Sequence, residues 1–164
     1  MTSGELHDLT LAAFLHDIGI SMLPRHLNIG INRLDCESYV TVQNHPRIGA
    51  LLLEPFFFLR EASVLIAHHH ERWDGSGYPY GIRGRFIPLG ARGLAIADAY
   101  DTITAPNHNP GTRHVIALRI LRVASGTQCD PALVATTTKI VFYRDRMGED
   151  PALSEWEGNV DLTR

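Results

Sequence analysis

The segment from His68 to Pro79 constrains the fold more than any other part of the chain, and it reads HHHERWDGSGYP. The stretch at 59–71 has the spacing of a helix, and the glycines and prolines that follow, at 73–90, require an ordered loop. Neutral imidazoles are the commonest metal ligands, so consecutive histidines at the end of an apolar helix indicate chemistry more than packing. The segment therefore predicts a helix that ends at a ligand-binding loop.

Helical spacing also dominates the remainder of the chain. The apolar residues from Leu6 to Ile18 predict a mostly buried helix that ends at Gly19. Asp35 is a natural N-cap for a helix that runs toward His45, and Pro46 requires a break or a new first turn. Because no run alternates apolar and polar residues as a strand does, the predicted fold class is all-α. Further helices are expected over 91–104, 114–124 and 131–143.

Length and composition favour one globular domain. The chain has 164 residues, of which 45% are hydrophobic, and this is enough for one core. We expect the domain to span residues 1–143 and a polar, flexible tail to span 144–164. The formal net charge of -3 argues against a nucleic acid polymer as partner, because phosphate backbones are bound by excess lysine and arginine.

The chain shows no sign of a membrane segment or of a disulfide framework. No apolar run approaches the length that crosses a bilayer. Cys36 and Cys129 lie far apart without CxxC spacing, which argues against a structural zinc site and leaves a single disulfide open. A reduced, cytoplasmic setting is expected.

Several polar residues stand where the helical pattern would bury them: His16, Asp17, His45, His69, His70 and Asp98. Each of them alone is explained more readily as a hydrogen-bonded core residue, a helix cap or an ion-pair partner. Burying the whole set without partners would be costly, whereas divalent cations satisfy several such groups at once. Nitrogen and carboxylate oxygen without thiolate suit iron, manganese, zinc, nickel or cobalt. Asp17 is the candidate for a carboxylate that bridges two cations.

The motifs of the chain resemble those of the HD-GYP domain, a branch of the HD phosphohydrolases associated with cyclic di-GMP hydrolysis in bacteria. The resemblance covers residues 9–142. It implies an all-helical HD bundle, a centre of two or three divalent metal ions in which iron or manganese is favoured, and hydrolysis of cyclic di-GMP to linear pGpG and GMP. It is carried by HDIG at 16–19, HP at 45–46, HHERWDGSGYP at 69–79, IPLGAR at 87–92, IADAYD at 96–101 and GTQCDPALV at 126–134.

Residue by residue, the resemblance implies a specific site. Asp17 would be the catalytic residue that bridges the cations and orients the attacking water. Gly77, Tyr78 and Pro79 form the signature loop, which would contact partner signalling domains, although a rigid turn is the simpler interpretation. His68 lies outside the motif. The implied metal ligands are His16, Asp17, His45, His69, His70 and Asp98.

The chain departs from the family pattern at its basic positions. Ile20 stands where a lysine usually follows HDIG, and Asn107 and Pro110 stand where the family carries charges that bind substrate phosphates. Arg83 and Arg85, beside the signature loop, are available replacements, although a solvated face is the simpler interpretation for them. A lysine and a proline of the family are likewise replaced, by glycine and isoleucine at 30–31.

These departures leave two alternatives to a cyclic di-GMP phosphodiesterase. Only a short segment precedes His16, so an upstream histidine ligand of the family has no counterpart, and the chain reads as a divergent, N-terminally short member. One alternative is a catalytically weakened or inactive HD-GYP module that acts in signalling through partner binding. The other is an HD hydrolase of another nucleotide or phosphate ester.

Overall fold

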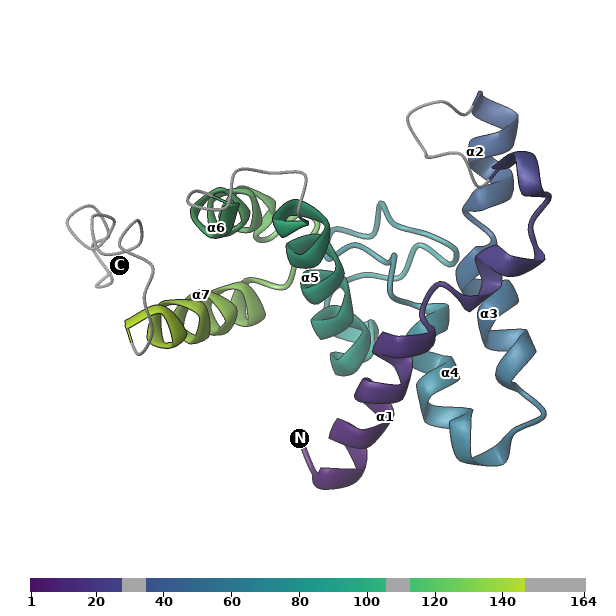
Figure 1. Cartoon of the computed structure of the whole chain (residues 1–164), viewed down its shortest axis with the longest axis horizontal. Coiled ribbons are helices and arrows are strands. Elements are labelled where there is room, and N and C mark those ends of the chain that lie inside the picture. Colours follow the sequence, from purple (N-terminus) through teal and green to yellow (C-terminus); the bar gives the residue numbers. More distant parts are fainter. Residues whose placement is uncertain (28–34, 106–112, 147–164) are drawn as a thin grey trace. The chain divides into compact units, whose positions relative to one another are not determined.

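The structure is a computed structural model that describes residues 1–27, 35–105 and 113–146 (Figure 1). The described residues form helices and no β-strand, which confirms the all-α prediction. The α-helices are α1 (Ser3–Leu15), α2 (Cys36–Val42), α3 (His45–Leu53), α4 (Arg60–Ala67), α5 (Leu89–Thr104), α6 (Arg113–Ala124) and α7 (Pro131–Arg146). Short 3-10 helices are η1 (Ile18–Met22), η2 (Arg25–Leu27), η4 (Phe57–Leu59) and η5 (Gly84–Phe86).

Side-chain caps and one proline set the boundaries of α2 and α3, as the sequence predicts. The Asp35 carboxylate accepts a hydrogen bond from the backbone N–H of Ser38 at 2.8 Å, which starts α2. The helix stops at Val42, and α3 begins at His45 with Pro46 in its first turn, where the missing N–H costs nothing. The predicted break before Pro46 is therefore confirmed, and it puts His45 at the start of a helix.

Helix α1 begins and ends earlier than the predicted range of 6–18. Thr2 and Glu5 form a capping box, in which each side chain accepts a hydrogen bond from the other residue's backbone N–H, and this starts the helix at Ser3. The helix ends at Leu15, and Gly19 lies in η1 instead of terminating α1. The expectation of a mostly buried helix is wrong, because Phe14 is 83% exposed.

The chain divides into two compact units, Met1–Ala95 and Ile96–Arg164, with the boundary inside α5. In the second unit, Asp130 starts α7 by accepting from the backbone N–H of Ala132 at 2.8 Å. Helix α7 continues to Arg146, past the predicted end at 143, and 147–164, most of the expected tail, lies outside the described residues. The core of this unit consists of Ile96, Leu121, Cys129 and Val134.

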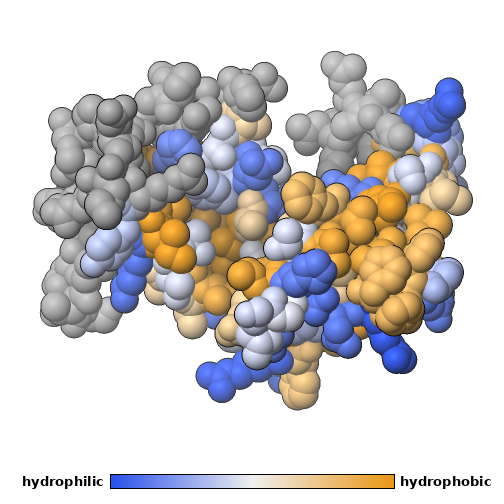
Figure 2. Space-filling model, turned by 60° about the horizontal axis from the view of Figure 1, so that its bottom comes forward, coloured by the Kyte–Doolittle hydropathy of each residue, from blue (hydrophilic) through white to orange (hydrophobic). Residues whose placement is uncertain are grey.

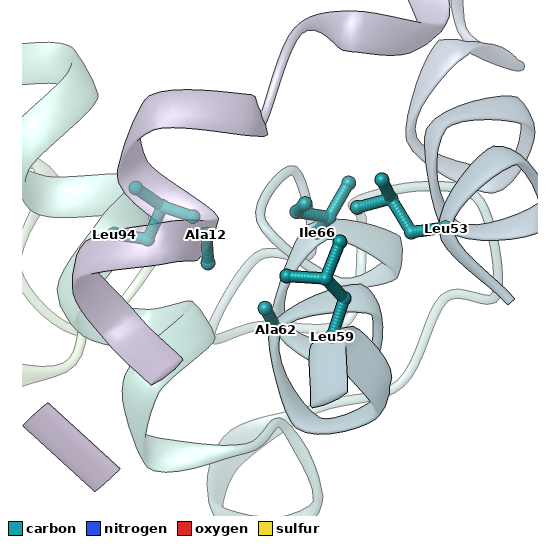
Figure 3. Close-up of a cluster of buried hydrophobic side chains, with 6 residues drawn as sticks. All are labelled: Ala12, Leu53, Leu59, Ala62, Ile66 and Leu94. Carbon is teal, nitrogen blue, oxygen red and sulfur yellow. The ribbon is translucent and has the colours of Figure 1, made fainter. Parts of the chain in front are cut away.

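The first unit has its own core, which joins α1 to the segments that follow it. Helices α1, α3, α4 and α5 and the short η4 each contribute (Figure 3). Leu53, Leu59 and Ile66 point toward one another in Figure 3, and Ala12 faces Leu94. A smaller cluster of Leu23, Leu27 and Val42 packs η1, η2 and α2 together. The main core comprises Ala12, Leu53, Leu59, Ala62, Ile66 and Leu94.

Part of the surface of the first unit is apolar. Phe56, Phe57 and Phe58, at the turn between α3 and α4, are 48%, 88% and 59% exposed. Figure 2 shows apolar side chains gathered on this unit, at the right of the view.

Among the described residues, no helix is long and apolar enough to cross a membrane. The single domain and the compartment stay predictions.

Candidate metal centre

Four residues from separate segments of the first unit converge on one point. Asp17 lies in the turn after α1, His45 opens α3, and His69 and His70 lie in the turn that follows α4. Each offers one ligand atom, and these atoms all lie within 4.8 Å of one another. The structure thus brings together four of the six residues that the sequence nominates as metal ligands.

Backbone carbonyls orient three of the imidazoles near this point. Nδ1 of His16 lies 2.9 Å from the carbonyl oxygen of Ala13, Nδ1 of His45 lies 2.8 Å from that of Val42, and Nδ1 of His69 lies 2.7 Å from that of Ile66. A carbonyl oxygen only accepts, so Nδ1 carries the proton in each pair and Nε2 keeps its lone pair. Such a bond fixes both the tautomer and the ring orientation that a ligating histidine needs.

Asp17 lies between two of these histidines. Its Oδ2 is 3.3 Å from Nε2 of His16, and its Oδ1 is 3.3 Å from Nε2 of His45. The contact with His16, and after it the contact with His45, holds the pKa of Asp17 well below its usual range. The side chain is nevertheless 52% exposed, so an ionised carboxylate faces solvent beside the histidine cluster.

Two of the nitrogens that face the centre are buried without a hydrogen bond. Nε2 of His45 and Nε2 of His69 are inaccessible to solvent, and neither has a hydrogen-bond partner among the described residues. Buried polar atoms of this kind are normally satisfied, because leaving them unpaired is costly. Unprotonated imidazole nitrogens beside an ionised carboxylate are a donor set that suits a divalent cation. The residues present therefore fit a metal ion.

Burial keeps His69 and His70 neutral. It lowers the pKa of His69 from 6.5 to about 4 and the pKa of His70 from 6.5 to about 3, and the neighbouring imidazoles lower both further. The rings of His69 and His70 lie with centroids 4.0 Å apart, and those of His45 and His70 lie 5.0 Å apart. At neutral pH, His69 and His70 are therefore neutral imidazoles, the form in which histidine binds a metal ion.

Gly19 allows the turn after α1 to reach α3. A Cβ atom at this position would collide with the carbonyl oxygen of His45 and would lie 2.7 Å from the backbone nitrogen of Gly49. Only glycine permits such a close approach of two backbones. The sequence indicates Gly19 as a helix stop, whereas the structure uses it to bring Asp17 against His45.

The signature loop folds back over His70. The N–H of Tyr78 donates to the carbonyl oxygen of His70 at 3.2 Å, and the Tyr78 ring lies 4.9 Å from the His70 ring, tilted by 32°. A Cβ atom on Gly77 would collide with the backbone nitrogen of Arg72 and would lie 2.6 Å from the His70 carbonyl oxygen. The Tyr78–Pro79 peptide bond is cis. The loop is therefore an ordered turn, as predicted, and it packs on a candidate ligand.

The other residues named from the sequence stand in other segments of the chain. Asp98 is half-buried in the part of α5 that belongs to the second unit, so its role as a ligand stays a prediction. Arg83 and Arg85 are exposed, as a solvated face requires. His68, expected outside the site, places its ring 5.1 Å from that of Tyr80. Positions 30–31, Asn107 and Pro110 lie outside the described residues.

One buried residue near the centre is absent from the sequence-based site. Glu71 directly follows His70 and is only 3% exposed, and its Oε1 accepts from the backbone N–H of Tyr80 at 2.7 Å. In the sequence it opens a polar, glycine-rich stretch, where a glutamate is expected to face solvent. The only available signal was its position between the histidine pair and the loop.

Comparison with known proteins identifies similar domains. Residues 1–133 match the model of a family described as HD domain. A cyclic di-GMP phosphodiesterase of Vibrio cholerae is 36% identical over 142 residues, which cover 82% of this chain and 29% of that protein. A cyclic di-GMP phosphodiesterase response regulator of Xanthomonas campestris is 34% identical over 137 residues, which cover 82% of this chain and 36% of the regulator. The chain thus spans about a third of the length of these relatives.

Other similarities concern a related substrate and the fold. A 3'3'-cGAMP-specific phosphodiesterase of Vibrio cholerae is 32% identical over 138 residues, covering 82% of this chain and 26% of that protein. The crystal structure of another cyclic GMP-AMP phosphodiesterase of this organism superposes with a TM-score of 0.66 at 22% identity, covering 86% of this chain and 39% of the other. An HDG"Y"P protein from Bdellovibrio bacteriovorus gives a TM-score of 0.63 at 24% identity, covering 82% and 43%.

Proposed function

Because the chain belongs to the HD domain family, in its HD-GYP branch, we propose that it is a metal-dependent phosphodiesterase that hydrolyses cyclic di-GMP. The observation that carries the proposal is the convergence of Asp17, His45, His69 and His70 within 4.8 Å. Their buried, unprotonated nitrogens and ionised carboxylate are what a hydrolytic metal site requires. The curated relatives whose names give cyclic di-GMP as substrate support the choice of substrate.

The proposed centre holds two or three divalent cations. Iron or manganese is favoured, with zinc, nickel or cobalt as alternatives, because the donors are imidazole nitrogen and carboxylate oxygen. The four clustered residues would provide the ligands, with His16 beside Asp17 and with Asp98 as a further ligand from α5. When bound, the cations supply Lewis acidity, which activates a water molecule and neutralises charge on the phosphoryl group.

Asp17 is the residue to which we assign the catalytic role. Its two oxygens face two different imidazoles, each at 3.3 Å, as a carboxylate that serves two neighbouring sites must do. Since its pKa lies well below the usual range, it stays ionised at working pH and can accept a hydrogen bond from the attacking water. Water then adds across one phosphodiester bond to give linear pGpG, and a second hydrolysis gives GMP.

The exposed arginines are the candidates for substrate contact. Arg83 and Arg85 flank the signature loop, which packs on His70, and both are exposed. Charge-assisted hydrogen bonds from arginine to phosphate are strong and often bidentate. We expect Arg85→Ala to weaken cyclic di-GMP binding at least tenfold, because such contacts are typically worth about 1.5–3 kcal/mol. Unchanged affinity in a calorimetric titration would show that the arginines only form a solvated face.

A panel of substrates tests the choice of cyclic di-GMP. Turnover of cyclic di-GMP, 3'3'-cGAMP and a simple phosphodiester is measured on protein reconstituted with Mn²⁺ or Fe²⁺ without oxygen. We expect cyclic di-GMP to give the highest kcat/KM. A preference for 3'3'-cGAMP would follow the similarity to the phosphodiesterase with that specificity and would overturn the assignment of substrate.

A non-catalytic signalling module is the second candidate. Ile20 favours it, since this apolar residue of η1 stands three positions after Asp17 where the family pattern has a lysine. Such a module would bind metal and contact partner domains through Gly77, Tyr78 and Pro79. It predicts no turnover in the wild type at full metal occupancy and partner binding that survives Asp17→Asn.

A further inference from the structure

We infer that Glu71 is a positioning residue of the metal centre: its carboxylate fixes the signature loop, and the loop fixes the ring of His70 through Tyr78. The inference rests on the proposed function, because it treats His70 as a metal ligand. Glu71 is not one of the four residues whose ligand atoms cluster.

Glu71 is buried, and one of its carboxylate oxygens accepts a hydrogen bond from the loop. The residue is 3% exposed, and its Oε1 accepts from the N–H of Tyr80 at 2.7 Å, across nine positions of the chain. A buried hydrogen bond is stronger than a solvated one, because the local dielectric constant is low. This bond therefore restrains the far side of the loop relative to the backbone that carries the histidine pair.

A second hydrogen bond restrains the near side of the loop. The N–H of Tyr78 donates to the carbonyl oxygen of His70 at 3.2 Å. Gly77 lies so close to the backbone of His70 and Arg72 that no side chain fits between them. The N–H groups of residues 78 and 80 are thus held by acceptors on two consecutive residues, so the backbone that carries the Tyr78 ring is restrained.

His70 needs this support more than the other histidines do. His16, His45 and His69 are each oriented by a bond from Nδ1 to a backbone carbonyl. For His70 no such bond exists within the described part of the chain, and its ring is held by ring packing. The rings of His69, at 4.0 Å, Tyr78, at 4.9 Å, and His45, at 5.0 Å, are its close neighbours. Tyr78 is the one of these three that is not itself a proposed ligand.

The orientation of a ligand depends on such outer contacts. Removing a residue that orients a metal ligand typically lowers metal affinity by about 10- to 100-fold. Loss of the Glu71 acceptor would free residues 78–80 and thereby the Tyr78 ring. The expected result is a weaker and differently arranged metal site without the removal of any ligand.

Four single variants, and the double variant Glu71→Ala/Tyr78→Ala, test the inference in metal-depleted protein. Glu71→Ala removes the acceptor, and Glu71→Gln keeps a side-chain carbonyl that can accept from Tyr80. Tyr78→Ala leaves that hydrogen bond intact and removes the ring. Glu61→Gln, on the exposed face of α4, is the matched control. The readouts are Mn²⁺ affinity by calorimetry and the visible absorption of bound Co²⁺, which reports the geometry of its ligands.

We expect Glu71→Ala and Tyr78→Ala each to weaken Mn²⁺ binding at least about tenfold and to change the Co²⁺ spectrum in the same way. Glu71→Gln should stay within about twofold of the wild type because the acceptor is retained. The double variant should bind Mn²⁺ no more weakly than the single variant with the lower affinity, because both changes act through one contact. Additive losses would assign Glu71 an independent structural role.

Other outcomes also decide the matter. Wild-type affinity in folded Glu71→Ala overturns the inference, and so does a loss in Glu71→Gln equal to that in Glu71→Ala. If Glu71→Ala does not fold, as judged by circular dichroism, Tyr78→Ala must still weaken binding and Glu71→Gln must not. A wild-type protein that binds no Mn²⁺ or Co²⁺ contradicts the proposed function instead, which separates the two failures.

Discussion

At the scale of single residues, the geometry of the centre depends on atoms that are not themselves proposed as metal ligands. Gly19 lets the turn that carries Asp17 approach the first residue of α3, where His45 lies. Ala13, Val42 and Ile66 contribute only their carbonyl oxygens, yet these select the histidine tautomer that leaves Nε2 available. The chemistry of the ligands is therefore set by the backbone around them.

Substitution of Gly19 tests this dependence. In Gly19→Ala the new methyl group would collide with the His45 carbonyl, so we expect the free energy of unfolding to fall by about 1–3 kcal/mol and Mn²⁺ affinity to fall with it. Gly93→Ala is the control, because a Cβ there meets nothing within 4 Å and alanine favours helix. Chemical denaturation and calorimetry measure both quantities. Equal stability of the two variants would show that the close approach is unimportant.

Two adjacent histidines provide the sharpest test of the ligand assignment. His69 points its Nε2 into the buried centre, whereas His68 packs its ring beside Tyr80. We expect His69→Ala to lower Mn²⁺ affinity by more than about tenfold, because it removes a ligand and not merely a residue that orients one. His68→Ala should bind Mn²⁺ as the wild type does. A similar loss in both variants would argue for a general effect on the turn.

The identities of the clustered residues could be predicted from the sequence, but the residues that position them could not. The motifs nominate Asp17, His45, His69 and His70, and the structure brings these four together. Glu71 was missed because its burial depends on the loop folding back over it, which no local pattern reveals. Likewise, the sequence shows that Gly19 has no side chain to block a close contact, but it does not show which backbone segment approaches it.

At the scale of elements, the turn after α4 carries two neutral histidines. In the unfolded chain an imidazole has its ordinary pKa near 6.5, whereas in the fold the pKa of His69 is lowered to about 4. Between these two values the unfolded chain binds more protons than the native protein. Metal-free protein should therefore lose stability as the pH falls from 6.5 toward 4, and the same sign holds for His70.

Urea unfolding of metal-free protein at several pH values measures this dependence. We expect the decrease in the free energy of unfolding on acidification to be smaller in His69→Gln, which has no titrating group at that position, than in the wild type. His68→Ala serves as the neighbouring control. A pH dependence that is the same in the wild type and His69→Gln would contradict a lowered pKa for His69.

Helix boundaries were predictable where a side chain marks them. Asp35 and Pro46 mark the starts of α2 and α3 as expected, because caps and prolines act locally. Asp130 caps α7 in the same local way. Thr2 and Glu5 have the spacing of a capping box, and this local pattern indicates the start of α1 where hydrophobic spacing does not. The end of α1 at Leu15 was not predictable, since it follows from the packing of η1 against α3.

At the scale of the whole molecule, the chain belongs to the HD domain family and departs from the family pattern in its sequence at positions such as Ile20. It spans about a third of the length of the phosphodiesterases to which it is similar. The first unit carries the histidine cluster and the signature loop, and the second unit carries Asp98.

The most direct measurement is metal-dependent turnover of cyclic di-GMP in the wild type and in Asp17→Asn, with metal content determined on the same samples. The protein is freed of metal and reconstituted with Mn²⁺ or Fe²⁺ without oxygen, and products are separated by chromatography. We predict at least one bound cation per chain, activity that rises with occupancy, and a loss of turnover in Asp17→Asn of at least about 100-fold. Full occupancy of the wild type without hydrolysis, or equal turnover in Asp17→Asn, would contradict a metal-dependent phosphodiesterase.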